Sequence, residues 1–152
     1  MKREAVTRLV LETFRLNGCL LAVGDALVAD VGLTSARWQV LGAIAESDVL
    51  LPVAHIARNM GLARQSVQRL VNEMKRAGLV RFEQNPHHRR AKLVLLTSRG
   101  KAAYEAAMKR QRSWANKLAS GLSVQRIDAA RAMLRTIRRR LDDQLDRGNG
   151  NI

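Results

Sequence analysis

The sequence predicts a mainly α-helical protein with one small β-hairpin, which is an α+β fold. Apolar residues recur at helical spacing over most of the 152 residues, and because only 3% of residues are aromatic, the core must be built from aliphatic side chains. The alternation that is typical of strands replaces this spacing around residues 80–97. The two prolines, Pro52 and Pro86, stand where the helical pattern breaks.

A long first helix is expected from about Glu4 to Val31, where apolar residues mostly follow helical spacing. Gly18 and Gly24 lie inside this helix, and each should cost about 1 kcal/mol relative to alanine. Such glycines suggest the close approach of a neighbouring backbone. Cys19 is the single cysteine and cannot form an intramolecular disulfide. We expect a buried, inert thiol, with redox sensing as the alternative.

Thr34 can cap a second helix that ends near Ser47. This helix should turn one apolar face inward, made of Trp38, Leu41, Ile44 and Ala45. Pro52 suits the first turn of a third helix, which Gly61 should close. The inward residues of the third helix are Val53, Ile56, Ala57 and Met60.

A fourth helix is expected to begin near Ala63 and to end at Gly78. Its apolar residues recur at i, i+3, i+4 and i+7 and define one buried stripe, made of Val67, Leu70, Val71 and Met74. The polar side chains of its N-terminal half must then face outward, beside N–H groups that can meet a phosphate. The wedge between the third and fourth helices should be filled by Ile56, Met60, Leu62, Val67 and Leu70.

The segments VRFEQ and KLVLLT flank NPHHRRA and predict a β-hairpin that turns at Asn85-Pro86. Thr97 or Ser98 should cap a fifth helix through about Ala119, and Ser123 should cap a sixth. The sixth helix carries a narrow apolar seam that needs a partner helix, made of Ile127, Ala130, Leu134, Ile137, Leu141 and Leu145. Residues 147–152 have no core pattern and are expected to fray.

The positive charge of the chain is concentrated in its middle. The whole sequence has 27 basic and 13 acidic residues, a net charge of +14. Residues 61–120 carry 14 basic and 3 acidic residues, whereas residues 1–60 carry 6 of each and residues 121–152 carry 7 and 4. A local surplus of this size indicates an anionic polymer or surface nearby, and the alternative is an ordinary solvated face.

Two helices joined by a tight glycine turn and followed by a basic hairpin form a winged helix-turn-helix; the alternative is an ordinary helical hairpin without DNA contact. In this interpretation the fourth helix enters the major groove of DNA and reads base edges with Arg64, Gln65, Ser66, Gln68 and Arg69. Arg90, with Arg89 beside it, suits the minor groove. Phosphate contacts are expected from Lys75, Arg76, Arg81 and Lys92.

These motifs resemble the MarR family of bacterial transcriptional regulators over about residues 4–146. The matching pieces are Leu33-Thr34, the segment AHIARNMGLARQSVQRLVNEMKRAGLVRFEQNPHHRRAKLVLLT and the Leu96-Thr97-x-x-Gly100 opening of the fifth helix. The resemblance implies a homodimer in which the first, fifth and sixth helices interlock. Residues 1–32 would then be a dimerisation helix, residues 33–99 a winged helix-turn-helix DNA-binding domain and residues 100–146 C-terminal dimerisation helices.

The wing departs from the family pattern at one position. Many members have Asp-x-Arg where this chain has His88-Arg89-Arg90, so the acidic residue that helps to hold the arginine is missing. Arg90 still matches the wing arginine. A protonated His88 would add a phosphate contact at low pH.

The resemblance also implies a pseudo-palindromic operator, repression as the common outcome, and a small-molecule effector between the dimer-forming helices and the DNA-binding lobe. Residues that could line an effector site are Arg15, Arg37, Trp38 and His55. The rival function is non-specific binding of nucleic acid, as in a nucleoid-type or RNA-binding protein. Competition between operator and random DNA separates the two, because a regulator prefers its own site by about a thousandfold or more.

Other chemistry is not expected. The histidines, carboxylates and single thiol form no spacing for a nucleophile and its base, so we predict neither an enzyme nor a cofactor. A metal at His87-His88 is disfavoured because neighbouring residues on an extended arm point to opposite faces. Without a signal peptide or an apolar span in the sequence, we expect a cytoplasmic protein with no membrane partner.

Overall fold

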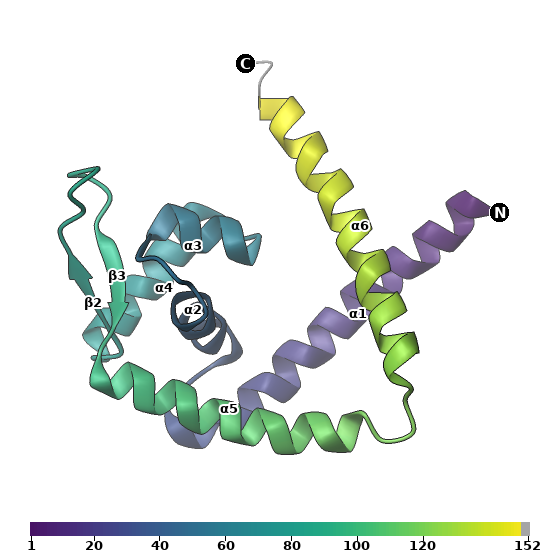
Figure 1. Cartoon of the computed structure of the whole chain (residues 1–152), viewed down its shortest axis with the longest axis horizontal. Helices are drawn as coiled ribbons and strands as arrows, with labels where there is room; N and C mark the ends of the chain where they lie inside the picture. The colour runs from purple at the N-terminus through teal and green to yellow at the C-terminus, as the bar shows by residue number, and fades with distance from the viewer. Residues whose placement is uncertain (150–152) are drawn as a thin grey trace. The chain divides into compact units, whose positions relative to one another are not determined.

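The computed structural model describes residues 1–149 and is mainly helical with a small antiparallel sheet, as predicted (Figure 1). The chain forms two compact units that divide between Arg112 and Ser113. The elements in chain order are α1 (Lys2–Val28), the 3-10 turn η1 (Ala29–Val31), α2 (Ser35–Ala45), β1 (Leu51–Pro52), α3 (Val53–Met60), α4 (Arg64–Arg76), β2 (Val80–Glu83), β3 (Leu93–Leu96), α5 (Ser98–Leu118) and α6 (Val124–Asn149).

The sheet contains the predicted hairpin and one strand that was not predicted. Strands β2 and β3 pair antiparallel with Val80 opposite Leu96, and β1 pairs with the other edge of β3, with Leu51 opposite Val94. Pro52 was expected in the first turn of a helix, whereas it ends β1 and caps α3. A strand of two residues is too short to show alternation, so only its pairing with β3 reveals it.

The helix-turn-helix closes over an aliphatic core. The predicted stripe of α4 is buried or half-buried, and the turn between α3 and α4 is made by Gly61, whose φ of 65° is left-handed as expected. Two details of the prediction were wrong. Leu62 is 48% exposed and lies outside the helix wedge, because the turn directs it away from the core. On α2, Ala45 is exposed and Val40 is fully buried instead.

Close contact between α1 and α2 explains one of the two α1 glycines. A Cβ on Gly24 would lie 2.4 Å from the Ser35 hydroxyl, which donates a hydrogen bond to the Leu21 carbonyl (2.7 Å). The sequence analysis predicted a neighbouring backbone at this position, whereas the close neighbour is a side chain. No atom of the described residues lies within 4 Å of a Cβ on Gly18, so the expectation was wrong there for the single chain. Cys19 is exposed rather than buried, because no residue among 1–149 covers its face of α1.

The start of α5 is tied to the end of α4. The Thr97 hydroxyl donates to the Gly78 carbonyl (2.6 Å) and accepts from the Gly100 N–H (3.0 Å), so Thr97 is the cap and Ser98 is the first helical residue. Gly100 is buried, and a Cβ there would lie 2.0 Å from the Leu79 carbonyl oxygen. The Thr97-x-x-Gly100 spacing is therefore a structural requirement for this close crossing.

Tyr104 links α5 to the end of α2. Its hydroxyl donates a hydrogen bond to the Glu46 carboxylate (2.8 Å), and it packs beside Gly42. Burial, the hydrogen bond to Glu46 and the negative charge of Glu46, in that order of size, together raise the pKa of Tyr104 to about 12. The neutral phenol is therefore the form that stabilises the folded state.

An absorbance titration at 295 nm will test this link directly, because Tyr104 is the only tyrosine in the sequence. Ionisation is expected near pH 12 instead of 10.0. The contribution of the phenol to stability is fully present below pH 10.0 and is lost as the pH rises towards about 12. Glu46→Gln should lower the pKa only in part, because burial is the largest cause. An ordinary pKa in a rapid pH-jump measurement on folded protein would contradict the assigned contact.

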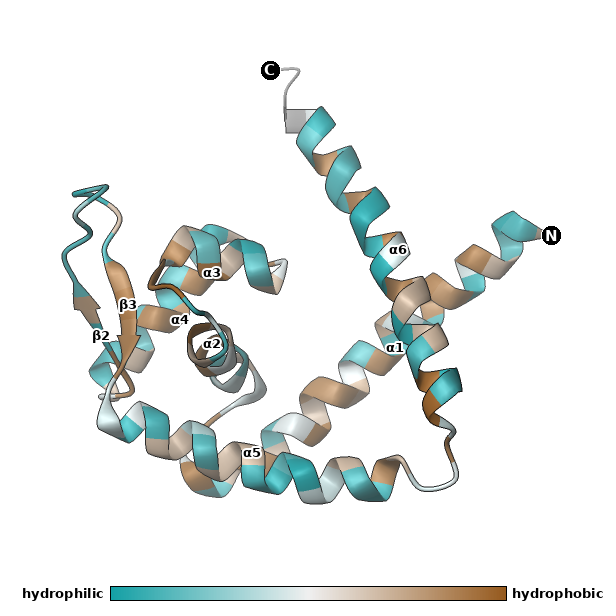
Figure 2. Cartoon of the chain, viewed as in Figure 1, coloured by the Kyte–Doolittle hydropathy of each residue, from teal (hydrophilic) through white to brown (hydrophobic). Residues whose placement is uncertain are grey.

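The second unit is dominated by α6. Ser123 caps this helix as predicted, accepting from the Arg126 N–H (3.3 Å). The predicted seam of α6 is exposed in the single chain except for the half-buried Ile137. The helix continues through Asn149, so residues 147–149 are helical and not the frayed tail that was expected, and residues 150–152 lie outside the described part. Hydrophobic residues recur along both α1 and α6 (Figure 2).

Within residues 1–149 no single helix has the length and hydropathy needed to cross a membrane; α1 with η1 reaches that hydropathy only together with α2, and this pair is bent by 80°.

Candidate nucleic-acid interface

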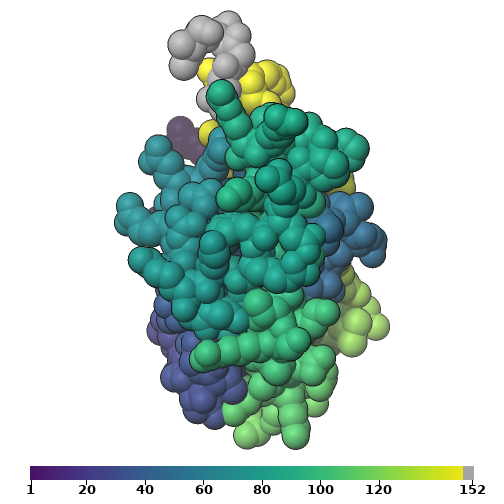
Figure 3. Space-filling view, turned by 90° about the vertical axis from the view of Figure 1, so that its left-hand side faces the viewer, coloured from purple at the N-terminus to yellow at the C-terminus, as the bar shows by residue number. Residues whose placement is uncertain are grey.

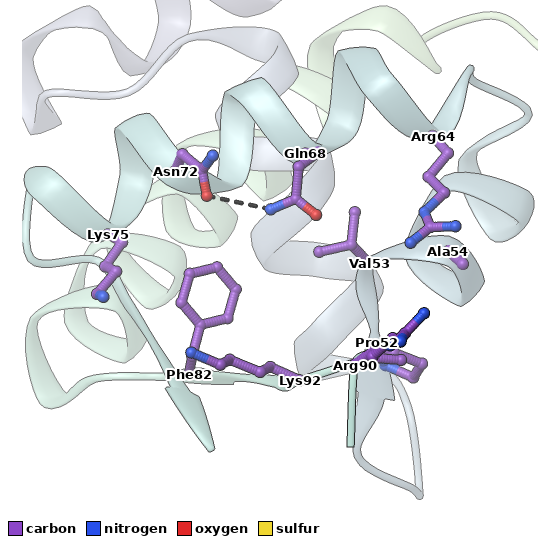
Figure 4. A pocket seen from close by; sticks show the side chains of 11 residues that line it. Pro52, Val53, Ala54, Arg64, Gln68, Asn72, Lys75, Phe82, Arg90 and Lys92 are labelled. Carbon is purple, nitrogen blue, oxygen red and sulfur yellow. Dashed lines mark hydrogen bonds between the residues drawn. The ribbon is translucent and has the colours of Figure 1, made fainter. Parts of the chain in front are cut away.

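The outward side of α4 and the arms of the hairpin border a groove of about 290 Å³ (Figure 4). Four residues of α4 at successive turns line it, namely Arg64, Gln68, Asn72 and Lys75. The hairpin contributes Phe82, Arg90, Ala91 and Lys92, and the start of α3 contributes Pro52, Val53 and Ala54. Within the described part of the chain, no acidic residue lines this groove, so its lining charge is entirely positive.

The local sequence leaves the N-terminus of α4 open. Gly61 reverses the chain after α3, and α4 begins at Arg64 with Ala63 as its N-cap. Alanine has no side-chain acceptor, and Ala63 makes no capping hydrogen bond. The first N–H groups of α4 therefore face solvent with the positive end of the helix dipole, which favours an anion beside Arg64.

Two contacts order the side chains along the groove. The Gln68 amide donates from Nε2 to Oδ1 of Asn72 (3.1 Å), one helical turn further along α4. The Lys75 ammonium lies 5.3 Å from the centre of the Phe82 ring, which is a cation–π distance and connects α4 to β2. The groove wall is thus held by contacts within α4 and between α4 and the hairpin.

The hairpin tip consists of two consecutive turns. Asn85 begins the first turn, as predicted: its side chain accepts from the His87 N–H (3.0 Å) and its carbonyl accepts from the His88 N–H (3.2 Å). The second turn is closed by the Ala91 N–H, which donates to the His88 carbonyl (3.0 Å) and leaves Arg89 and Arg90 at its centre. Both arginines are exposed, and Arg90 also lines the groove.

The other predicted DNA-contacting residues lie around the groove. Four of them are exposed on the surface of α4, namely Gln65, Ser66, Arg69 and Arg76. Figure 3 views the molecule from the side of the hairpin, and the residues coloured teal cover much of this face. Arg81 does not join the groove. It pairs with Glu83 on the face of β2 opposite Phe82, because alternate residues of a strand face opposite sides.

Asn72 and Phe82 are groove residues that the sequence analysis missed. Asn72 lies one turn after Gln68, so helical spacing from Arg64 and Gln68 would have found it. Phe82 has no sequence signal for this role, because the pairing of β2 with β3 and the packing against α4 bring it here. Pro52 also lines the groove, whereas the sequence analysis gave it only a helix-starting role.

The four candidate effector residues are spread over the first unit. Arg15 is exposed on α1 and pairs with Glu12 (3.5 Å), and Arg37 reaches Glu73 of α4 (3.9 Å). Trp38 is half-buried against the core. His55 lines a second groove on the other side of Arg64 and Arg90, together with His87 and His88. Among the described residues, no group of three or more His, Cys, Asp or Glu side chains could hold a metal ion.

Comparisons with known proteins agree with this architecture. A family model described as the MarR family matches residues 31–91. An uncharacterized protein of Mycobacterium tuberculosis is 36% identical over 132 residues, covering 87% of this chain and 91% of that protein. The transcriptional activatory protein BadR of Rhodopseudomonas palustris is 31% identical over 106 residues, covering 68% of this chain and 61% of BadR.

Solved structures of similar fold include Sco5413, a MarR family transcriptional regulator from Streptomyces coelicolor. It is 26% identical with a TM-score of 0.76, covering 91% of this chain and 96% of that chain. The regulator MosR of M. tuberculosis in complex with DNA has a TM-score of 0.73 at 24% identity, with 87% and 96% covered. CouR from Rhodococcus jostii bound to p-coumaroyl-CoA has a TM-score of 0.75 at 24% identity, with 85% and 90% covered.

Proposed function

Because the chain belongs to the MarR family of transcription regulators, we propose that it binds a pseudo-palindromic operator as a homodimer and represses transcription until a small-molecule effector releases it. The observation that carries this proposal is the groove between α4 and the hairpin, which combines base-reading amides with cationic side chains. Such a regulator acts on chromosomal DNA in the cytoplasm.

In this proposal α4 lies in the major groove of DNA, where each base pair displays its own pattern of donors and acceptors. Arg64, Gln65, Ser66, Gln68 and Arg69 read base edges, and the hairpin places Arg90 in the adjoining minor groove with Arg89 and His88 beside it. Lys75, Arg76 and Lys92 contact phosphates. Arg81, which pairs with Glu83 on the other face of β2, is left out of this set. The DNA complex of MosR, which has the same fold, supports this use of the domain.

Exposed apolar surface on the helices outside the DNA-binding domain supports a homodimer. On α1, Phe14 is 71% exposed, and on α6, Leu145 is 67% exposed. Apolar side chains recur along both helices, and most of those between Val6 and Val23 and along α6 are exposed in the described part of the chain. A second copy would cover them, since water-exposed apolar faces of this extent mark protein–protein contacts. Twofold pairing would set two copies of α4 about 34–36 Å apart for successive half-sites.

The proposals for the effector and for the direction of regulation rest on similarity to other proteins and not on particular residues of this chain. The complex of CouR with p-coumaroyl-CoA supports release by a small organic molecule. BadR carries the name of an activatory protein, so a transcription assay must decide between repression and activation for this chain.

Selection of bound sequences from random double-stranded DNA tests the proposal. A regulator is expected to enrich one palindromic site and to prefer it over random DNA by about a thousandfold or more. Equal binding of every duplex would instead identify a non-specific nucleic-acid-binding protein. Sedimentation of the free protein tests the dimer separately, and a stable monomer would contradict it.

Arg64→Ala should reduce discrimination between operator and random DNA by about 1–3 kcal/mol if Arg64 reads a base. Competition binding with both duplexes measures this difference. Arg139→Ala, which removes the same charge from an exposed position of α6, is the matched control and should leave discrimination unchanged. Equal weakening on both duplexes would assign Arg64 to a phosphate.

A further inference from the structure

Among the described residues of the groove, Gln68 and Asn72 carry side-chain amides, and the two amides are hydrogen-bonded to each other. Nε2 of Gln68 donates to Oδ1 of Asn72 at 3.1 Å, and both residues line the same wall (Figure 4). Asn72 is the only hydrogen-bond partner of the Gln68 side chain among residues 1–149. Asn72 itself is exposed, so its side chain is not needed to fill the core.

We propose that Asn72 is a positioning residue that presents the Gln68 amide to an adenine in each half-site of the operator. The proposal rests on the proposed function, because it requires α4 to lie in the major groove. It adds a base preference and a residue that controls it.

Hydrogen-bond chemistry selects the base. The Gln68 amide has two N–H donors and one carbonyl acceptor, and Asn72 takes one of the donors. One donor and the acceptor Oε1 remain on the same amide plane. Adenine presents an acceptor at N7 and a donor at N6 in the major groove, which this remaining pair matches. Guanine presents two acceptors there and leaves Oε1 without a donor.

Fixing the amide before binding increases selectivity. A free glutamine side chain has many rotamers, and ordering it at an interface opposes binding. The contact with Asn72 restricts Gln68 in the free protein, and helical spacing of i, i+4 makes the contact local to α4. The groove wall on either side is set by Val53 and Phe82, which are apolar and offer the amide no competing partner.

Selection from random DNA should be repeated with Gln68→Ala, Asn72→Ala, Asn72→Asp and the double variant. Gln68→Ala is expected to lower the preference at one base-pair position of each half-site by about 5- to 150-fold. Asn72→Ala should lower it at the same position by about two- to thirteenfold, since it removes only the preorganisation. Asn72→Asp keeps a carboxylate acceptor for Nε2 and should restore the preference, even where its charge weakens binding to every sequence.

The double variant should lose no more preference at that position than Gln68→Ala alone, because Asn72 acts through Gln68. Asn59→Ala, an exposed asparagine on α3 outside the groove lining, is the matched control and should leave the profile unchanged. Circular dichroism of each variant verifies folding.

An unchanged profile for Asn72→Ala, equal loss at all positions, or failure of Asn72→Asp to restore the preference would overturn the inference while leaving the proposed function intact. A wild-type protein that enriches no sequence would overturn both.

Discussion

Raising the salt concentration from 50 to 200 mM is expected to weaken operator binding by about a thousand- to hundred-thousandfold, if the dimer neutralises about six to ten phosphates. Each cation that meets a phosphate releases counterions from DNA, so the affinity falls with salt. The surface around the groove supplies these cations, and no described acidic residue lines the groove to offset them. Fluorescence anisotropy of labelled operator over a salt series measures the effect as a slope of log affinity against log salt.

Removal of one cation should change that slope by a defined amount. Lys92→Ala deletes a groove lysine from each protomer and should reduce the slope by about 2 in a dimer, at about 0.9 per contact. Lys117→Ala, on the last turn of α5, is the charge-matched control and should leave the slope unchanged. An affinity that stays constant across the salt series would contradict phosphate neutralisation as the source of binding.

Gly100→Ala is expected to be the most destabilising single methyl addition in the first unit. The new Cβ would lie 2.0 Å from the Leu79 carbonyl oxygen, and neither backbone can move without breaking the hydrogen bond from the Thr97 N–H to that carbonyl (3.1 Å). Forcing atoms into a packed site of this kind costs about 3 kcal/mol or more. Urea unfolding followed by circular dichroism measures the change in free energy of unfolding.

Gly42→Ala is the matched control for that substitution and should act in the opposite direction. Its Cβ would make ordinary contact with the Tyr104 ring at 3.6 Å, inside α2. Alanine favours a helix over glycine by up to about 1 kcal/mol, so stability should rise. A destabilisation equal to that of Gly100→Ala would show that the crossing between α5 and Leu79 is not the cause.

The predicted elements that proved correct depend on local chemistry. Thr34, Thr97 and Ser123 cap helices because a hydroxyl beside the first turn satisfies free N–H groups. Gly61 and Gly78 end helices because their left-handed φ values suit glycine. The buried stripe of α4 follows from spacing alone, and it determined which side chains, Gln68 among them, face outward.

The features that sequence analysis missed or misassigned depend on contacts between distant segments. Strand β1 exists only because β3 lies beside it, and the paired residues Leu51 and Val94 are 43 positions apart in the sequence. Arg81 faces away from the groove because Glu83 pairs with it and Phe82 packs towards α4. The predictions for Cys19 and Gly18 came from the residue pattern of α1 alone. That pattern cannot show whether another segment packs on the same face of the helix.

The sequence by itself therefore determined the helices, their caps, the glycine turn and the concentration of positive charge, because each depends on residues within a few turns of one another. Only the tertiary structure decided which of those charges share a groove, that Phe82 lies beside Lys75 of α4, and why Gly100 must lack a side chain. These properties arise where strands and helices that are far apart in the sequence come into contact. Neither residue spacing nor composition predicts which distant segments will meet.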